Sequence, residues 1–262
     1  MSDKYEAITL TIEDGLAVLT LNQPDRLNAL SKAIKSEVTH ALRTLGRPGG
    51  RARALLITGS GRGFCSGANL AEGMGGDADS GANLMDTYHP MLLELAALPI
   101  PVISAVNGVA AGAGMSLALS ADIVLASRSA YFLLAFVNIG LVPDAGVTFL
   151  LPRLIGKARA TAQMMLGEKI SAETAKDWGM IYDVVEDDDL MPTALALGKR
   201  LANGPTKALS GIRQLMAASL NGTYVEQLQR EAETQRQCSR TADFIEGVSA
   251  FMQKRPTKFE GR

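Results

Sequence analysis

The chain has 262 residues, of which 47% are hydrophobic, so it is long and apolar enough to bury a full core. Its 26 Lys and Arg residues balance 27 Asp and Glu residues, and the absence of a basic tract argues against a nucleic-acid partner. There is no charged leader before an apolar run, and no apolar run approaches the ~20 residues of a membrane span, so we expect neither a signal peptide nor a membrane partner.

The first hundred residues alternate apolar runs with helical spacing. The runs LAVLTL and ALLIT predict strands at 16–21 and 54–58. The spacing over 27–45 predicts a helix between them, with Asn28 or Ser31 available as its N-cap. Residues 71–83 are small, polar and glycine-rich, and we expect a mobile loop there.

A helix is predicted from this loop to Leu98, because Pro99 and Pro101 would end it. The turn and helix predicted over 108–120 are rich in glycine and alanine. Further short apolar runs predict strands at 102–106, 123–126 and 131–134.

From Gly156 onward the chain is mostly helical, with caps predicted at Ser171 and Thr241 and one more strand at 183–185. Alternating strands and helices followed by a helical block indicate an α/β fold. We expect parallel strands crossed by helices, with a helical layer at the C-terminal end.

Several motifs suggest chemistry that the rest of the chain does not support. GSGRGF (59–64) has its third glycine one position early for a dinucleotide fingerprint. Ser116, in GMSLA, resembles a hydrolase nucleophile, but both histidines, His40 and His89, precede it, whereas that triad needs a later His. We interpret Ser116 as a small packing residue and both histidines as structural or surface groups.

The two cysteines, Cys65 and Cys238, show neither metal-ligand spacing nor a disulfide framework. Cys65 has no base that the sequence places beside it, so we interpret it as a small buried residue. The pattern predicts a reducing, cytoplasmic setting and no metal site.

Asp144 is the one carboxylate in the apolar stretch AFVNIGLVPDAGVTFLLPRL (135–154). Two roles compete for it. It could cap a helix starting at Ala145 by accepting hydrogen bonds from the first amides. It could instead lie in a dry pocket, with a pKa suited to moving protons. The motif alone favours the cap.

Two glycine-rich turns each follow a buried strand, GFCSGANL at 63–70 and NGVAAGAGMSL at 107–117. Turns this small can point backbone amides into a cleft, and two such donors could hold one developing oxyanion. Two tight packing turns are an equally good interpretation on spacing alone.

The sequence resembles the crotonase, or enoyl-CoA hydratase/isomerase, family over nearly its whole length. The matching segments, in order, are LNQPDRLNAL (21–30), ALLITGSGRGFCSGANL (54–70), VISAVNGVAAGAGMSLALSADIVLAS (102–127), FVNIGLVPDAGVTFLLPRLIGKARA (136–160), LGEKISAETAKDWGMIYDVV (166–185) and EGVSAFMQKRPTKF (246–259). Several long motifs in the same order make the resemblance specific.

The resemblance implies a spiral of repeated ββα units and a thioester enolate held by two backbone amides, here those of Ala68 and Ala113. It implies coenzyme A as part of the substrate and no separate cofactor. Asn69 stands where the family usually has Asp. The implied contacts to coenzyme A and substrate are Arg26, Leu27, Ala29, Ser66, Ala68, Asn69, Leu70, Phe136, Phe251 and Lys254.

The departures from the family bear on the reaction. Hydratases of the family carry two glutamates, and this chain has Ser116 and Phe136 at those positions. Asp144 is then the remaining carboxylate in the segment that lines the family's acyl pocket. We expect Phe136, Val142 and Val147 to raise its pKa by desolvation, while a helix N-terminus would lower it.

One base suffices for an isomerase, so the resemblance favours an acyl-CoA isomerase with Asp144 as the base. The reaction would move a 3-enoyl double bond to the 2-position or rearrange a ring-epoxide phenylacetyl-CoA, as in the branch of the family that acts in phenylacetyl-CoA degradation. The alternatives are a hydratase of low or altered activity and a non-catalytic scaffold that binds coenzyme A. Glu94 and His89 are the next candidates for the base.

The resemblance also implies a homo-oligomer, either a trimer or a dimer of trimers. We expect residues 1–199 to form the spiral core with the acyl-CoA site, and residues 200–262 to form a helical oligomerisation region. In the family, the residues matched by Phe251 and Lys254 often reach the nucleotide end of coenzyme A on a neighbouring subunit.

Overall fold

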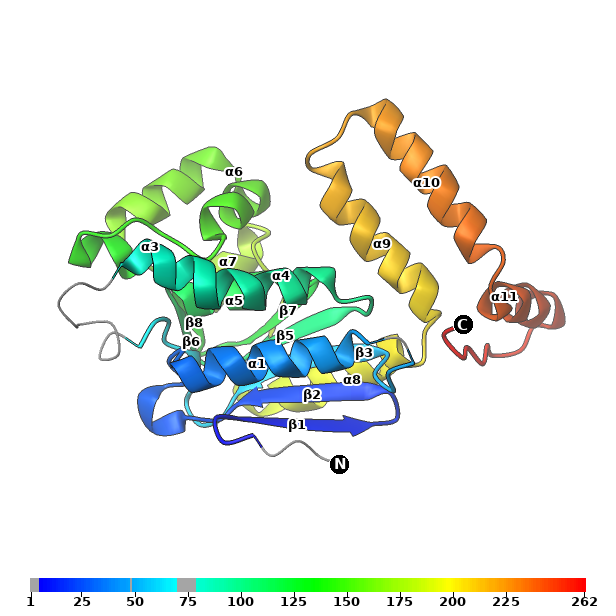
Figure 1. Ribbon diagram of the computed structural model, residues 1–262, viewed down its shortest axis with the longest axis horizontal. Coiled ribbons are helices and arrows are strands. Elements are labelled where there is room, and N and C mark those ends of the chain that lie inside the picture. Colours follow the sequence, from blue (N-terminus) through cyan, green and yellow to red (C-terminus); the bar gives the residue numbers. More distant parts are fainter. Residues whose placement is uncertain (1–4, 48, 70–78) are drawn as a thin grey trace.

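The computed structural model describes residues 5–47, 49–69 and 79–262, which form two sheets packed with helices (Figure 1). The larger sheet has the strand order β1 (Ile8–Glu13), β2 (Leu16–Leu21), β3 (Ala54–Gly59), β5 (Val102–Val106), β7 (Ile123–Ser127) and β10 (Asp183–Val185). β1 and β2 are antiparallel, and the other neighbouring pairs are parallel. β3 and β5 are buried along their whole length, which explains their nearly unbroken apolar sequences.

The smaller sheet has the strand order β4 (Gly63–Cys65), β6 (Val109–Ala111), β8 (Tyr131–Leu133) and β9 (Lys169–Ser171). β4, β6 and β8 are parallel, whereas β9 runs antiparallel to β8. Each of these strands has three residues, too few to show an alternating pattern. The sequence does not predict β4, β6 or β9, whereas β8 lies within the apolar run at 131–134 and is predicted.

β1 is another strand that the sequence analysis does not predict, although its signal is present. Its sequence ITLTIE alternates buried and more exposed residues. Asp14 and Gly15 then form the turn into β2 with positive φ angles of 49° and 80°. An Asp-Gly pair in this conformation is the preferred two-residue connection between antiparallel strands.

Helices cover both faces of the larger sheet. α1 (Lys32–Leu45) and α4 (His89–Ala97) share the main apolar core with Leu55 and Ile57 of β3. α8 (Leu190–Ala202) packs in a second core with Ala54 and Leu56 of the same strand. Because successive side chains of a strand point to opposite faces, one apolar strand serves both cores.

The helix predicted from residue 27 begins only at α1. Ser31 is its N-cap, and the hydroxyl of Ser31 accepts a hydrogen bond from the amide of Ile34. Asn28 is not a cap: it is fully buried in the left-handed conformation, with φ 55°. Its side-chain amide donates to the carbonyls of Ser60 and Gly63, at 2.9 and 2.8 Å, and so holds the 59–64 turn in place.

The helical segment before Pro99 is continuous but not uniform. α3 (Ser80–Asn83) leads into a π-helical turn (Leu84–Tyr88), and α4 follows directly. The predicted loop at 71–83 is therefore wrong for residues 80–83, and its part from 71 to 78 lies outside the described residues. Asp79 caps α3 by accepting a hydrogen bond from the amide of Ala82.

The remaining helices follow the predicted order. α5 (Ala113–Leu119) is the helix expected within 108–120, and α6 (Val147–Leu166) is kinked at Gly156. Ser171 and Thr241 cap α7 (Ala172–Asp177) and α11 (Ala242–Gln253) as predicted. Short 3-10 turns lie at η1 (Pro24–Arg26), η3 (Ala135–Ile139) and η4 (Asp187–Asp189).

α9 (Thr206–Ser219), α10 (Tyr224–Cys238) and α11 form an arm that extends away from the layered body (Figure 1). Arg213 anchors α9 to the body: its guanidinium pairs with Asp122 at 2.8 Å and donates to the carbonyls of Leu95, Ala96 and Leu98. These carbonyls end α4, so a cation there also complements the helix dipole.

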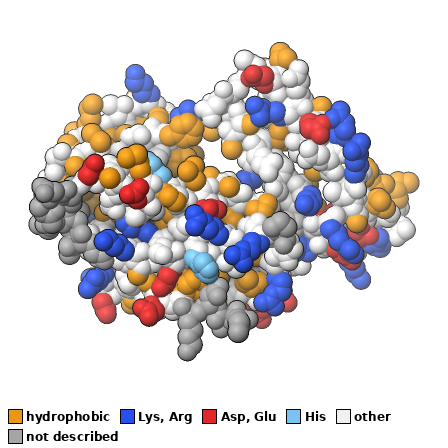
Figure 2. Space-filling view, viewed as in Figure 1, with side chains coloured by type: hydrophobic (Ala, Val, Ile, Leu, Met, Phe, Trp, Pro, Cys, Tyr) orange, Lys and Arg blue, Asp and Glu red, His pale blue; other side chains and the backbone are white. Residues whose placement is uncertain are grey.

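The arm leaves many large apolar side chains exposed, and Figure 2 shows orange side chains over α11 at its outer end. They lie on all three helices, and α11 carries the largest share. The exposed residues are Ile212, Met216, Leu220, Tyr224, Val225, Leu228, Phe244, Ile245, Val248, Phe251 and Met252.

Candidate active site

The candidate site lies at the carboxyl ends of three parallel strands. β4, β6 and β8 are neighbours in the smaller sheet, so the segments that follow them emerge at one edge. Ligands of α/β proteins bind outside such strand ends. The turn 66–69 follows β4, the turn into α5 follows β6, and η3 and then Asp144 follow β8.

Backbone hydrogen bonds join the turn 66–69 to the segment 26–30. The amide of Ser66 donates to the carbonyl of Leu27 at 2.9 Å, and the amide of Leu30 donates to Gly67 at 2.7 Å. The Ser66 hydroxyl donates to the carbonyl of Arg26 at 3.3 Å. The structure thus brings together six of the predicted substrate contacts: Arg26, Leu27, Ala29, Ser66, Ala68 and Asn69.

The other predicted contacts are placed differently. Leu70 lies outside the described residues. Phe251 is 83% exposed on α11, and Lys254 is the left-handed residue that ends this helix. α11 lies at the opposite end of the molecule from β6 and β8 (Figure 1), so Phe251 and Lys254 do not join the cluster of their own chain.

The two glycine-rich turns pack backbone against backbone. Gly67 has φ 95°, and a Cβ there would lie 2.7 Å from the carbonyl oxygen of Ala111 and 3.5 Å from the amide nitrogen of Ala113. Gly112 has φ 51°, and a Cβ there would lie 3.9 Å from the Cα of Gly67. Only glycine permits this approach at Gly67. Ala68 and Ala113, the predicted oxyanion donors, therefore follow glycines on adjoining turns.

The amide of Ala113 also opens α5, and the first amides of a helix have no acceptor within it. Phe136 covers this turn: the ring Cζ lies 3.5 Å from where a Cβ of Gly112 would stand. An apolar ring therefore occupies the position at which the family resemblance places the second glutamate of hydratases.

The prediction that Asp144 caps a helix is wrong. α6 begins at Val147 with Gly146 as its N-cap, and no side chain caps it. The carbonyl of Asp144, not its carboxylate, accepts a hydrogen bond from the amide of Val147 at 3.2 Å. The helix starts later than predicted because Ala145 and Gly146 adopt left-handed conformations, with φ 51° and 85°.

The Asp144 carboxylate is half-buried, and its Oδ1 atom is buried without a hydrogen-bond partner among the described residues. Burial raises the pKa of Asp144, and the nearby charge of His89 lowers it in part. The sequence left open whether desolvation or a helix N-terminus would dominate this pKa, and burial is the larger effect. Of the apolar neighbours expected to cause it, Val147 is buried, whereas Val142 is 79% exposed.

His89 is an exposed side chain at the first position of α4, directly after the π-helical turn. Its backbone amide donates to the carbonyl of Leu84 and closes that turn. The interpretation of His89 as a structural or surface group did not include the effect of its charge on Asp144. Such turns are often found at functional sites.

Ser116 is fully buried in α5, as its interpretation as a packing residue requires. Its hydroxyl also donates a hydrogen bond to the carbonyl of Asp144 at 3.2 Å. No sequence pattern signalled this contact, because 28 residues separate the two positions.

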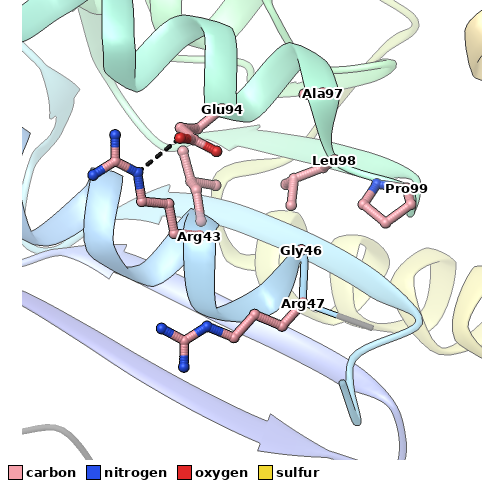
Figure 3. Close-up of a pocket in the computed structure, with 8 residues that line it drawn as sticks. Arg43, Gly46, Arg47, Glu94, Ala97, Leu98 and Pro99 are labelled. Carbon is pink, nitrogen blue, oxygen red and sulfur yellow. Dashed lines mark hydrogen bonds and ion pairs between the residues drawn. The ribbon is translucent and has the colours of Figure 1, made fainter. Parts of the chain in front are cut away.

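Glu94, one of the two reserve candidates for the base, is engaged elsewhere. Its carboxylate forms an ion pair with Arg43 at 2.7 Å, across the α1–α4 interface (Figure 3). The pair lines a surface pocket of about 340 Å³ whose other walls are Leu42, Gly46, Arg47, Ala97, Leu98 and Pro99. The pocket does not include residues of the cluster around Asp144.

The remaining candidates are structural in the described part of the chain. Cys65 is fully buried, and burial raises the pKa of its thiol to about 12, which disfavours the reactive thiolate form. His40 shares a hydrogen bond with the hydroxyl of Tyr5 at 3.1 Å. Among the described residues, no cluster of His, Cys, Asp or Glu side chains could hold a metal ion, and no helix is long and apolar enough to cross a membrane.

Successive strand pairs define the class of fold. β3 and β4, β5 and β6, and β7 and β8 each place one strand in the larger sheet and the next in the smaller one. Helices follow these pairs, which is the repeated ββα unit of the crotonase spiral. The amide-bearing turns at the strand ends fit this fold.

Comparison with known proteins agrees. The sequence pattern of the family described as enoyl-CoA hydratase/isomerase matches residues 11–262, and the chain belongs to this family. The 1,2-epoxyphenylacetyl-CoA isomerase of Escherichia coli K12 is 45% identical, with 98% of this chain and 99% of the relative covered. A Rhodobacter capsulatus protein named "Probable enoyl-CoA hydratase" is also 45% identical, with the same coverage. The crystal structure of an enoyl-CoA hydratase from Bacillus anthracis has a TM-score of 0.93 and 29% identity, covering 98% of this chain and 100% of that one.

Proposed function

We propose that the protein is an acyl-CoA isomerase that uses Asp144 as a single base. The supporting observation is that Asp144 stands at the strand ends as a half-buried carboxylate, while Ser116 and Phe136 supply no titratable group there. The substrate is either a 3-enoyl-CoA, converted to the 2-enoyl isomer, or a ring-epoxide phenylacetyl-CoA. The identity to an epoxyphenylacetyl-CoA isomerase supports the second substrate.

In the proposed reaction, the carboxylate of Asp144 removes a proton next to the thioester carbonyl. The electron pair of the broken C–H bond moves onto the carbonyl oxygen, and the amides of Ala68 and Ala113 stabilise the enolate with hydrogen bonds. The protonated Asp144 then returns the proton at another carbon, and the thioester carbonyl re-forms. The substrate gains and loses no atom overall, so the product has the mass of the substrate.

The environment of Asp144 suits this role. A general base works best when its pKa lies near the working pH, and burial moves the pKa of Asp144 in that direction. Hydration of a double bond would need one group to activate water and another to handle the α-proton. With Ser116 and Phe136 in place of glutamates, a second acid–base side chain is absent from those two positions.

A hydratase is the second candidate, because a relative with that name is equally identical to this chain. Mass spectrometry on purified protein with 2-enoyl, 3-enoyl and ring-epoxide CoA thioesters separates the two. An isomerase leaves the mass unchanged and alters the ultraviolet spectrum, whereas a hydratase adds the mass of water. Binding of acetyl-CoA by calorimetry without turnover of any thioester would instead support a non-catalytic scaffold.

The charge of His89 leads to a prediction about pH dependence. Protonated His89 favours the carboxylate form of Asp144, so His89→Gln should raise the pKa of Asp144 further. The acid limb of kcat/KM should therefore move to higher pH, with activity preserved at the alkaline end. α5 and η3 carry no titratable side chain, Glu94 is paired with Arg43, and the first charged side chain of α6 is Arg153.

The matched control is His40→Gln, which removes the other histidine of the chain, at the surface beside Tyr5. Its acid limb should coincide with that of the unmodified protein. If both variants give the same profile, His89 does not set the ionisation of Asp144.

We also propose a homo-oligomer, a trimer or a dimer of trimers, built through residues 200–262. The exposed large apolar side chains of α9, α10 and α11 are the supporting observation, because clustered exposed apolar residues mark interaction surfaces. Light scattering at micromolar concentration should give three or six times the 27.7 kDa of one chain. Ile245→Glu, which charges a 65% exposed position on α11, should lower that mass. A monomer in the unmodified protein would contradict this proposal.

A further inference from the structure

α5 connects the two parts of the proposed site. Ala113, whose amide is a proposed oxyanion donor, is its first residue, and Ser116 follows three positions later on the same face. All seven residues of the helix are buried, so it cannot shift without disturbing the core. A group that is hydrogen-bonded to Ser116 therefore has a fixed position relative to the Ala113 amide.

The hydroxyl of Ser116 makes such a hydrogen bond to the backbone of Asp144. A serine inside a helix commonly bonds the carbonyl four residues before it. Here the hydroxyl instead donates to the carbonyl of Asp144 at 3.2 Å. Because Ser116 is fully buried, water cannot replace this partner, and a buried hydroxyl needs one.

The backbone of Asp144 needs such support. Ala145 is 4% exposed and held at φ 51°, which L side chains rarely adopt, and Gly146 follows at φ 85°. A strained turn persists only when surrounding contacts fix it. The carbonyl of Asp144 supplies two of them, because it accepts hydrogen bonds from both Ser116 and the amide of Val147.

We propose that Ser116 is a positioning residue, which holds Asp144 at a fixed distance from the oxyanion-binding amide of Ala113. This inference rests on the proposed isomerase function. The position that carries a glutamate in hydratases of the family then serves the single base of this chain instead of acting on the substrate. The proton must leave one carbon and reach another while the thioester oxygen stays bound. The distance from Asp144 to these carbons and the distance from the Ala113 amide to the oxygen must therefore be right at the same time.

Ser116→Ala tests the proposal because it removes the hydroxyl with little change in volume. We expect kcat to fall by about 10-fold, since small misplacement of a catalytic group slows the reaction strongly. KM should stay within about twofold, because Ser116 is not a proposed substrate contact. Ser120→Ala is the matched control: it removes a hydroxyl that caps the same helix and bonds the carbonyl of Ser116, without touching Asp144. It should keep the kcat of the unmodified protein.

A double-mutant cycle with Asp144→Asn then separates positioning from general loss of structure. If Ser116 acts through Asp144, adding Ser116→Ala to Asp144→Asn should cause no further loss of kcat. Equal kcat values for Ser116→Ala and Ser120→Ala, or losses that multiply in the double variant, would overturn the inference while leaving the proposed function intact. Full turnover in Asp144→Asn alone would overturn the proposed function and this inference with it.

Discussion

Asp144→Asn is expected to lower turnover by about 100-fold or more, the usual contribution of a positioned general base. The amide has nearly the shape of the carboxylate but cannot accept the proton. Binding should change little, because the proposed grip on the thioester lies in the backbone at Ala68 and Ala113. The measurements are steady-state kcat and KM with the CoA thioester that mass spectrometry identifies as the substrate.

The fold should tolerate this change well. The carboxylate caps no helix, and its buried Oδ1 has no hydrogen-bond partner among the described residues, so neither Asn nor Ala at position 144 removes a stabilising bond. The melting temperature of both variants should therefore equal or exceed that of the unmodified protein. Had Asp144 been a cap, Ala would have cost about 1 kcal/mol and Asn almost nothing.

The difference in free energy of unfolding between Asp144→Asn and the unmodified protein should also depend on pH, with a defined sign. Burial raises the pKa of Asp144, so the folded protein holds this proton more tightly than the unfolded chain does. The penalty for ionising a buried carboxylate is absent at low pH and grows as the pH rises through the raised pKa. The stability advantage of Asp144→Asn should accordingly be larger at pH 7 than at pH 4.

Asp188→Asn is the control for this pair of measurements, because it neutralises an exposed carboxylate in η4. It should leave turnover and its pH profile unchanged. Near-normal turnover in Asp144→Asn would mean that the base lies elsewhere. His89 would then be the candidate, since Glu94 is held by Arg43.

Most of the fold prediction rested on long apolar runs in the sequence. The six predicted strands are all present. The clearest were β3 and β5, because a strand buried on both faces leaves a continuous apolar signal. The three-residue strands β4, β6 and β9 leave no such signal. They exist because neighbouring strands supply hydrogen bonds, a tertiary cause that local sequence does not show.

Helix ends were predictable only where a side chain determines them. Ser31, Ser171 and Thr241 accept hydrogen bonds from the helices that they cap, and their residue types indicate this. α6 begins instead after a left-handed Ala145, a residue type that rarely adopts this conformation. The cap hypothesis, one of the two roles left open for Asp144, placed the start of α6 at Ala145, and that hypothesis is wrong.

The candidate site was likewise predictable only in part. Its glycine turns were visible in the sequence, because Gly67 and Gly112 follow short apolar segments and require positive φ. The contact of Ser116 with Asp144 and the charge of His89 on Asp144 arise from packing between α5, α4 and the segment before α6. Distances across the fold fix both, so no spacing along the chain could indicate them.

Gly67→Ala should reduce kcat/KM by about 100-fold or more, the usual loss when one oxyanion donor is removed. The new methyl group would stand 2.7 Å from the carbonyl oxygen of Ala111 on the adjoining turn, closer than atoms approach, and backbone atoms cannot rotate away. The turn that carries the Ala68 amide must therefore move away from the turn that carries Ala113. The two donors would then no longer converge on one oxygen.

Gly49→Ala distinguishes this displacement from the general strain of alanine in a left-handed conformation. Gly49 has φ 78°, and a Cβ there would meet nothing within 4 Å. It should therefore lower the free energy of unfolding by about 1–2 kcal/mol without affecting turnover. Chemical denaturation should show that Gly67→Ala remains folded while kcat/KM collapses, because the exposed Ala68 beside Gly67 leaves the turn room to move outward. A folded Gly67→Ala protein with more than half of the normal kcat/KM would show that the amides of Ala68 and Ala113 do not bind the developing oxyanion.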